Sequence, residues 1–470
     1  MAGFKLNVAF QVAAVLAFTR LTAWAEVTTA GDAPTVIFGQ PVPSILYAGK
    51  TGTGSIGVTG GTHSFLRLDV GSDTGTGQTL PTAVGTLTIL DHAVVSSNLI
   101  YAGGPGTGRV YVTDSTLVAN VASGVGPGSF YDLLDSGFRT TSLFLSQGAW
   151  LNLDHSSFSG RLDLTGGSTA DLSGAFIGDF ANPQLTPVFV SSSDANAGRL
   201  TMDAASSGSV GQVKIGVSVD GFCQRATFDV LEGSYLYARS MQIGEMAGEV
   251  ALPGLGEVLV SGAGSGLNVT GRLDVVANEM GRLFVDEGAT LAADKLAVGR
   301  LADAVSIPSQ AVFGGNSTVT VASELEVARG VVEVVTGAKL QSNTAARIGT
   351  AAIEGRLTVT DASFKSSGLL TIGDNGIGRV AITRINNALP DLLWTIDNIR
   401  IGRGAGSSGT LVFDHAGGVL NSLELGAGGS AALDLTHGTV LLVPNLGLKG
   451  NGASVVRATI EHDARLATGS

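Results

Sequence analysis

Residues 47–57, YAGKTGTGSIG, contain the residue types of a nucleotide-binding loop: a Gly-Lys-Thr triplet and the glycine spacing G-x-G-x-x-G. A phosphate-binding loop needs another glycine five residues before the glycine of the Gly-Lys pair, so that successive N–H groups surround the phosphate. Ser44 occupies that position. The dinucleotide-binding loop must open a helix, whereas residues 58–71, VTGGTHSFLRLDVG, alternate like a β-strand. We therefore interpret Lys50 as an incidental surface residue and predict no nucleotide and no cofactor.

The side chains best suited to metal binding or proton transfer are six histidines, which are scattered singly along the sequence. The sequence contains no H-E-x-x-H or C-x-x-C zinc motif and no G-x-S-x-G motif of serine hydrolases. A calcium-binding G-G-x-G-x-D repeat would need an aspartate where Gly108 lies. We predict that each histidine is a surface or strand residue and that there is no metal site. The histidines are His63, His92, His155, His415, His437 and His462.

Carbohydrate cleavage would need two carboxylates about 5–10 Å apart. The best such group in the sequence is THG at residues 436–438, with Asp434 and Glu424 nearby. It lacks the paired aspartates and the basic and aromatic elements of polygalacturonases, and aromatic residues make up only 6% of the chain, which is few for a sugar-stacking groove. We predict no catalytic residue, and a β-helical polysaccharide lyase or glycoside hydrolase stays as the enzymatic alternative.

The elements that must position these residues are strands. The 470 residues include 68 glycines and few good helix formers, and no long stretch shows a 3.6-residue apolar period. An apolar content of 44% predicts a large core. The net charge of −12 argues against nucleic acid and anionic membranes as partners. Cys223 is the single cysteine, so no intrachain disulfide can form, and we interpret it as a small buried side chain.

Residues 1–25 have the organisation of a signal peptide. Lys5 precedes an apolar run at residues 6–18, and Ala23-Trp24-Ala25 forms an A-x-A-like cleavage site. The apolar run is too short to span a membrane as a helix. We therefore predict export and a mature chain that begins at Glu26.

A short unit repeats along the chain. Residues 45–62, ILYAGKTGTGSIGVTGGT, align without a gap with residues 99–116, LIYAGGPGTGRVYVTDST; the glycines recur and the lysine does not. The first half of the unit is two apolar residues flanking any residue, followed by glycine or alanine, and the second half, after a short glycine loop, is G-R-[LV]-x-apolar. Successive Gly or Ala corners are roughly 20–33 residues apart, as in stacked solenoids. These corners lie at 216, 244, 277, 299, 328, 349, 373, 402 and 426, and the Gly-Arg pairs begin at Gly108, Gly160, Gly198, Gly271, Gly281, Gly355 and Gly378.

One unit cannot bury its own apolar row, but stacked units form a continuous core. We therefore predict an all-β fold, a right-handed parallel β-helix (solenoid) of three short strands per turn, with glycines at tight corners where φ is positive. A β-propeller is less suitable because its blades run to about 40 or more residues. The predicted organisation is a signal peptide at 1–25, N-terminal turns at 26–120, less regular turns at 121–209, regular glycine-rich repeats at 210–449, and a C-terminal cap or frayed tail at 450–470.

The stretches LTIGDNGIGRVAITR, GRLFVDEGATLAADKLAVG and VLVSGAGSGLNVTGRLDV resemble the glycine-rich repeats of bacterial autotransporter (type V secretion) passengers and of PEP-CTERM-associated proteins. The resemblance covers residues 211–442 and implies an exported β-helical stalk, often adhesive. Neither the alternating strands of an autotransporter barrel nor a PEP-CTERM sorting tail follows, so we expect a fragment without its barrel, a degenerate copy, or a passenger released without an anchor.

The function that these features predict is a non-catalytic structural and adhesive stalk, secreted or held at the bacterial outer membrane. The expected partners are a surface glycan or protein and an outer-membrane translocator, with no nucleic acid and no nucleotide. A phage-type receptor-binding fibre is a further alternative, because a solenoid surface leaves its outward side chains free for any partner.

Overall fold

The structure is a computed structural model, and it describes residues 26–34, 45–71, 82–178, 186–192, 198–218, 225–245, 255–276, 281–299, 309–385, 394–449, 455–461 and 463–468. They form β-strands and the corners that join them, and no helix among them is long and apolar enough to cross a membrane. The predicted signal peptide, Cys223 and His462 lie outside these residues. The chain divides into two compact units, Met1–Gly160 (unit 1) and Arg161–Ser470 (unit 2).

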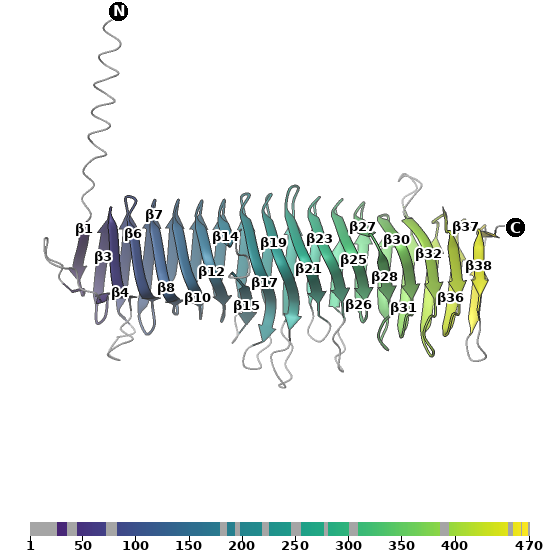
Figure 1. The fold of residues 1–470 in the computed structure, drawn as a ribbon, viewed down its shortest axis with the longest axis horizontal. Helices are drawn as coiled ribbons and strands as arrows, with labels where there is room; N and C mark the ends of the chain where they lie inside the picture. The colour runs from purple at the N-terminus through teal and green to yellow at the C-terminus, as the bar shows by residue number, and fades with distance from the viewer. Residues whose placement is uncertain are drawn as a thin grey trace, which may run out of the picture. The chain divides into compact units, whose positions relative to one another are not determined.

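Unit 1 contains two parallel ladders in which each strand pairs with the strand two places further along the chain (Figure 1). Ladder A joins β3, β5, β7, β9 and β11, and ladder B joins β2, β4, β6, β8 and β10. At one edge of ladder A, β1 pairs with β3 in the antiparallel direction. The strands are β1 (Glu26–Gly31), β2 (Ile45–Ala48), β3 (Thr53–Thr59), β4 (Thr62–Val70), β5 (Val84–Leu90), β6 (Val94–Ala102), β7 (Thr107–Thr113), β8 (Thr116–Val125), β9 (Phe130–Leu134), β10 (Gly137–Leu145) and β11 (Trp150–Asp154), and β12 (Ser157–Leu164) contains the unit boundary.

Unit 2 repeats the two ladders, and near its end β34, β37 and β40 form a further short one. Its strands are β13 (Thr169–Ser173), β14 (Phe176–Gly178), β15 (Val188–Ser192), β16 (Arg199–Asp203), β17 (Ser207–Ser218), β18 (Arg225–Val230), β19 (Tyr235–Glu245), β20 (Leu255–Ser261), β21 (Gly266–Val275), β22 (Arg282–Asp286), β23 (Thr290–Val298), β24 (Ser309–Phe313), β25 (Thr318–Val327), β26 (Gly330–Val335), β27 (Lys339–Ser342), β28 (Ala345–Ile348), β29 (Gly355–Thr360), β30 (Ser363–Ile372), β31 (Ile377–Thr383), β32 (Trp394–Ile401), β33 (Ser408–Asp414), β34 (Gly418–Val419), β35 (Ser422–Leu425), β36 (Ser430–Thr436), β37 (Val440–Val443), β38 (Asn445–Leu448), β39 (Val456–Ile460) and β40 (Arg465–Thr468).

This pairing is that of a coil, because the chain must complete a turn before it returns beside itself. In unit 1, Val110 lies opposite Tyr131, which lies opposite Leu151. In unit 2, Leu357 lies opposite Val380. All of these side chains are fully buried and form apolar columns inside the coil. A turn takes about 20 to 32 residues, within the repeat length of solenoids. The structure confirms the predicted parallel β-helix.

The three strands per turn arise from one straight strand and one bent strand. The straight strand belongs to ladder A, and the ladder B strand changes its inward face part-way along: in β6, Val95 and Ser97 point inward, and after the bend Ile100 and Ala102 do. The register shifts at the bend between β6 and β8. In unit 2 the two arms separate into β27 and β28, which both pair with β25.

Glycine is required where ladder B ends and ladder A begins. Eight glycines of the predicted apolar-x-apolar-Gly pattern have φ between 67° and 79°, a region that favours glycine. They are Gly71, Gly216, Gly244, Gly299, Gly349, Gly373, Gly402 and Gly426. Close approach adds to this requirement, since a Cβ on Gly373 would lie 2.5 Å from the carbonyl oxygen of Ser408 in the next turn.

The glycine of the Gly-Arg pair is required for a different reason, which is close approach of the backbone of the preceding turn. Gly378 does not have positive φ, but a Cβ there would lie 2.4 Å from the carbonyl oxygen of Ile348 and 2.5 Å from the amide nitrogen of Gly373. Gly376, between the two, also lacks positive φ, and its Cβ would lie 1.5 Å from the carbonyl oxygen of Ala351. Glycine at these positions allows the backbones of consecutive turns to approach closely.

Buried serines line the opposite corner, where ladder A ends, a feature that the sequence analysis did not find. In unit 1, Ser115 N donates to Ser136 Oγ at 3.2 Å, and Ser136 N donates to Ser156 Oγ at 3.0 Å. Each hydroxyl also donates to a carbonyl of its own turn, as Ser136 does to Leu134 at 2.7 Å. This serine ladder satisfies amide groups that the corner removes from the strand ladders.

The segment 450–470 was expected to cap the last turn or to fray. Its described residues carry β39, which extends ladder A from β36, and β40, which pairs with β37. Both pairings are parallel, so this segment continues the strand pattern of unit 2. Arg457 on β39 lies 3.3 Å from Asp434 on β36, which links the segment to the preceding turn.

Candidate functional site

A cluster of three metal-ligating side chains lies at the corner after β33 and β36. β33 ends at Asp414 and β36 ends at Thr436, and the two residues lie opposite each other in the parallel register. The residues that follow, His415 and His437, are therefore brought side by side. The sequence analysis treated these histidines singly and did not find this grouping, because residues 22 positions apart in the sequence occupy the same place in consecutive turns. We name Asp414, His415 and His437 the corner triad.

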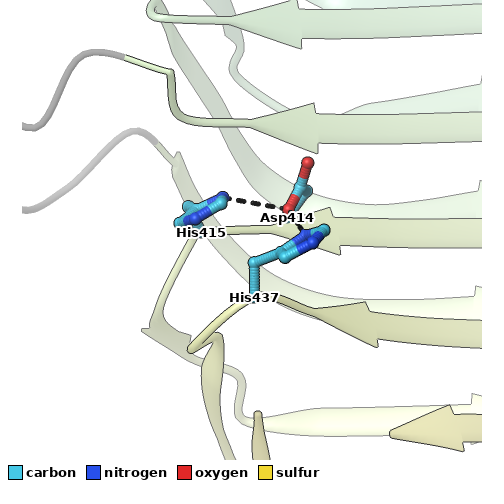
Figure 2. A group of neighbouring side chains, drawn as sticks. All are labelled: Asp414, His415 and His437. Carbon is cyan, nitrogen blue, oxygen red and sulfur yellow. Dashed lines mark hydrogen bonds and ion pairs between the residues drawn. The ribbon is translucent and has the colours of Figure 1, made fainter. Parts of the chain in front are cut away.

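The two imidazoles of the corner triad share one carboxylate oxygen (Figure 2). Asp414 Oδ1 lies 3.0 Å from Nδ1 of His415 and 2.7 Å from Nδ1 of His437. The rings stack with their centroids 4.9 Å apart and their planes 4° from parallel. Since a carboxylate oxygen only accepts, both Nδ1 atoms carry a proton in this arrangement. Thr436 Oγ1 donates to the same oxygen at 3.0 Å.

The backbone at the corner triad has a left-handed conformation and rests on buried aromatic side chains. His415 and His437 have φ of 52° and 46°, the left-handed conformation found after most ladder A strands. Phe413, fully buried beneath Asp414, packs against Trp394 with ring centroids 5.0 Å apart. A Cβ on Gly418 would lie 2.0 Å from Trp394 Cζ2, so glycine is needed there to leave room for the indole.

The surroundings favour the ionised form of Asp414. Partial burial would raise the pKa of this carboxyl, but hydrogen bonds from His437 and Thr436, together with the charges that the imidazoles can carry, hold it below its ordinary value. The side chains of Asp414, His415 and His437 are 28%, 48% and 53% exposed. The corner is therefore an anionic oxygen flanked by two imidazoles that solutes can reach.

The two acids that the sequence analysis grouped with residues 436–438 form ion pairs with basic side chains outside the corner triad. Asp434 pairs with Arg457, and Glu424 lies on β35 of the other ladder, where it bonds Arg400 and Lys449, each at 2.7 Å. Hydrogen bonds from Lys449 and Arg400 lower the pKa of Glu424. The structure therefore joins His437 to Asp414 and does not join it to Glu424.

The other described histidines have at most one acidic partner each. His92 Nδ1 lies 3.1 Å from Asp114, and His155 Nδ1 lies 2.6 Å from Asp154. His63 Nε2 contacts the carbonyl oxygen of Gly60 at 2.9 Å. Asp–His pairs therefore recur at the corner after ladder A, and the corner triad is the group of three among the residues that the structure describes.

Five arginines of the Gly-Arg pairs form ion pairs with acids. Arg199 is 3.2 Å from Asp229, and Arg161 is 2.7 Å from Asp163. Similar ion pairs join Arg272 to Asp274, Arg282 to Glu257 and Arg356 to Glu354. These positions therefore carry paired charges, which weakens any attraction for a polyanion.

The backbone amides of the glycine-rich loop at 47–57 are hydrogen-bonded to an aspartate of the same chain. Asp32 accepts hydrogen bonds from the amide of Thr51, from the amide of Gly52 at 2.8 Å and from the Thr51 hydroxyl at 3.2 Å. Burial would raise the pKa of Asp32, but these hydrogen bonds lower it overall. Lys50 Nζ lies 5.7 Å from the centre of the Tyr47 ring. The amides of Thr51 and Gly52, which a phosphate-binding loop would direct at a phosphate, donate to Asp32 instead and stabilise the corner.

A row of aromatic side chains crosses the outer surface of ladder A in unit 1. Tyr111 on β7, Phe130 on β9 and Trp150 on β11 form the aromatic row, with ring centroids 5.3 Å apart for Tyr111–Phe130 and 6.1 Å for Phe130–Trp150. Trp150 is 40% exposed, and the other two are half-buried. The sequence analysis missed this row, although its members are spaced by nearly one turn.

Polar groups border the aromatic row. Tyr111 lies opposite Asp132, and Asn152 donates to Asp132 Oδ1 at 2.8 Å. On the other side of the row, Arg109 lies opposite Phe130. The outward positions of three consecutive strands therefore combine ring faces with a carboxylate, an amide and a guanidinium.

Comparison with known proteins finds no matching family model, no matching curated protein and no matching solved structure. The functional argument therefore rests on the described residues. Two places carry chemistry beyond the repeat: the corner triad in unit 2 and the aromatic row in unit 1.

Proposed function

We propose that this protein is an exported, non-catalytic β-helical adhesin that binds a surface carbohydrate through the aromatic row. The observation that carries the proposal is the row itself: Tyr111, Phe130 and Trp150 on consecutive strands, with ring centroids 5.3 and 6.1 Å apart. Large apolar side chains that stay exposed on a sheet surface are typical of binding sites.

The chemistry of the row suits a sugar better than an apolar protein surface. One face of a pyranose ring presents C–H groups with partial positive charge, which are attracted to the negative face of an aromatic ring. The hydroxyl groups of the same sugar need donors and acceptors beside the ring. Asp132, Asn152 and Arg109 supply both kinds.

The length of the row also favours a chain of sugars. Adjacent strands of a ladder are about 4.8 Å apart, so three strands present a surface that is long enough for more than one sugar residue. Single stacking contacts are weak, and several in a row add affinity.

Export is supported by residues 1–25, which have the organisation of a signal peptide. The resemblance to autotransporter passengers and PEP-CTERM-associated proteins supports placement at the cell surface or outside the cell. A translocator in the outer membrane would be the partner for export.

A non-catalytic role is supported by the pairing of surface acids. Glu424 and Asp434 are each bound to basic side chains. Sugar cleavage needs one carboxyl that stays protonated and a second that stays ionised. The hydrogen bonds from Lys449 and Arg400 hold Glu424 in its ionised form.

Binding to immobilised polymers of glucose, galactose, mannose and N-acetylglucosamine, measured by surface plasmon resonance, tests the proposal. We expect one class of polymer to bind and Trp150→Ala to weaken that binding about tenfold, which corresponds to about 1.4 kcal/mol. The matched control is Phe144→Ala, because Phe144 is 47% exposed but lies on β10 in ladder B. Equal losses for the two variants, or no binding to any polymer, would contradict carbohydrate binding by the row.

Two further measurements test the other parts of the proposal. Incubation of the bound polymer with the protein should release no reducing ends and no unsaturated products. N-terminal sequencing of protein recovered from the periplasm or medium should begin at Glu26, and a cytoplasmic protein that keeps Met1 would contradict export.

A further inference from the structure

We propose that the corner triad binds one divalent late transition-metal ion, such as Zn²⁺, Ni²⁺ or Cu²⁺, and thereby joins two consecutive turns of unit 2. The proposal is independent of carbohydrate binding, because the aromatic row belongs to unit 1. It rests on the juxtaposition of Asp414, His415 and His437 at one corner.

The donor set decides the class of metal. Two imidazole nitrogens and one carboxylate oxygen suit zinc, nickel and copper, whereas calcium and magnesium bind through oxygen atoms alone. Three protein ligands also leave a coordination position for water or a solute, the arrangement found in open zinc sites. The triad lies on the surface, so an ion reaches it without opening the core.

The distances are close to those of a metal centre. Metal–ligand bonds of about 2.0–2.1 Å in a tetrahedron place ligand atoms about 3.3 Å apart. Asp414 Oδ1 lies 3.0 and 2.7 Å from the two Nδ1 atoms, and the ligand atoms of the triad all lie within 4.8 Å of one another. An ion therefore needs shifts of only a few tenths of an ångström between oxygen and nitrogen.

Binding also requires a change in ring orientation. The two imidazoles are stacked 4° from parallel, and parallel rings cannot both direct a lone pair in their planes at one ion between them. His415 and His437 are about half exposed, and each ring would have to turn about its Cβ–Cγ bond to direct a lone pair at the ion. The proton leaves each ligating nitrogen for the other ring nitrogen through water, which keeps each imidazole neutral.

The carboxylate is already oriented for this role. Thr436 donates to Asp414 Oδ1, and Phe413 beneath it is fixed by Trp394. Partners of this kind orient a ligating side chain and increase metal affinity. The corners at His92 and His155 bring only one histidine to one aspartate. They therefore provide controls with the same backbone setting and too few ligands.

An ion at the triad would link the end of β33 to the end of β36. Asp414 and His415 come from one turn and His437 from the next. Binding to the folded state alone adds stability in proportion to the logarithm of the metal concentration over its dissociation constant. The effect should be local, since each turn of a solenoid contacts mainly its neighbours.

Titration calorimetry with Zn²⁺ tests the proposal on the full chain without a histidine tag, in a Cys223→Ser background that removes the thiol. We expect one ion per chain, and we expect His437→Gln and Asp414→Asn each to weaken binding by at least about tenfold. Electron paramagnetic resonance of bound Cu²⁺ should show coupling to two nitrogens, reduced to one in His437→Gln. Hydrogen exchange of residues 408–436 should slow when Zn²⁺ is added.

His92→Gln and His155→Gln are the matched controls and should leave affinity, stoichiometry and the copper spectrum unchanged. The variants are compared without metal first, and unchanged circular dichroism shows that each still folds. The proposal is overturned if the chain binds no Zn²⁺ at millimolar concentration, if His437→Gln binds as the parent does, or if the control variants lose as much affinity as the triad variants.

Discussion

The serine ladder of unit 1 predicts that a single buried hydroxyl stabilises the corner between two turns. Ser136 is 7% exposed, and its Oγ accepts the amide of Ser115 at 3.2 Å and donates to the carbonyl of Leu134 at 2.7 Å. Ser136→Ala removes the hydroxyl and keeps the Cβ, so packing is unchanged. The carbonyl of Leu134 still accepts the amide of Asp114 at 3.0 Å, whereas the Ser115 amide loses its acceptor. The carbonyl of Val112, which lies 3.1 Å from Ser136 Oγ, loses a donor.

The expected cost follows from the buried Ser115 amide, which is left without an acceptor. A buried donor without a partner costs about 1–3 kcal/mol, and a tenfold change in an equilibrium constant corresponds to about 1.4 kcal/mol. Hydrogen exchange at the Ser115 amide should therefore accelerate by about 5- to 150-fold, measured by mass spectrometry on a peptide that covers this residue. A local measurement is preferable, because a solenoid can unfold in blocks.

Two companion variants isolate the hydroxyl. Ser136→Thr keeps it and should preserve slow exchange, since Thr439 makes the equivalent bond to the amide of Ala416 in unit 2. Ser64→Ala changes an exposed serine on β4 and should alter stability by less than about 0.5 kcal/mol. The reasoning would be refuted if Ser136→Ala left Ser115 exchange and the unfolding midpoint at the values of Ser64→Ala.

Three further predictions concern other corners. Gly373→Ala should destabilise more than Gly406→Ala in urea unfolding, because both have positive φ (68° and 75°) but only Gly373 is closely approached, and equal costs would contradict a role for that contact. Asp32→Asn should lower the melting temperature at neutral pH, and the difference from the parent should shrink as the pH falls below the ordinary aspartate pKa of about 3.9. The pKa of Asp32 is lower in the folded protein than in the unfolded chain, so its carboxylate stabilises the fold above the unfolded-state pKa. This stabilisation is lost as the pH falls through the folded-state pKa, and a difference in melting temperature that stays constant with pH would contradict it. Gly418→Ala should displace Trp394 and cost about 1–3 kcal/mol, and an unchanged unfolding midpoint would contradict the tight contact.

The sequence by itself determined the fold class and the position of the corners. Alternating apolar residues predict strands with one inward face, and a glycine that follows many of the apolar-x-apolar segments predicts a turn with positive φ. Both are local properties of the backbone, so a short stretch is enough to show them. The glycines from Gly216 to Gly426 in that pattern have the expected φ for this reason.

The tertiary structure alone decided which residues of different turns meet. A turn takes about 20 residues at β9 and about 31 between β31 and β33, so no fixed spacing relates one turn to the next. His415 and His437, 22 positions apart, share a corner because the turn between them has that length. The aromatic row and the hydrogen bonds from Thr51 and Gly52 to Asp32 arise in the same way. Side-chain neighbours in a solenoid depend on register across turns, which variable loops set and which local sequence patterns do not contain.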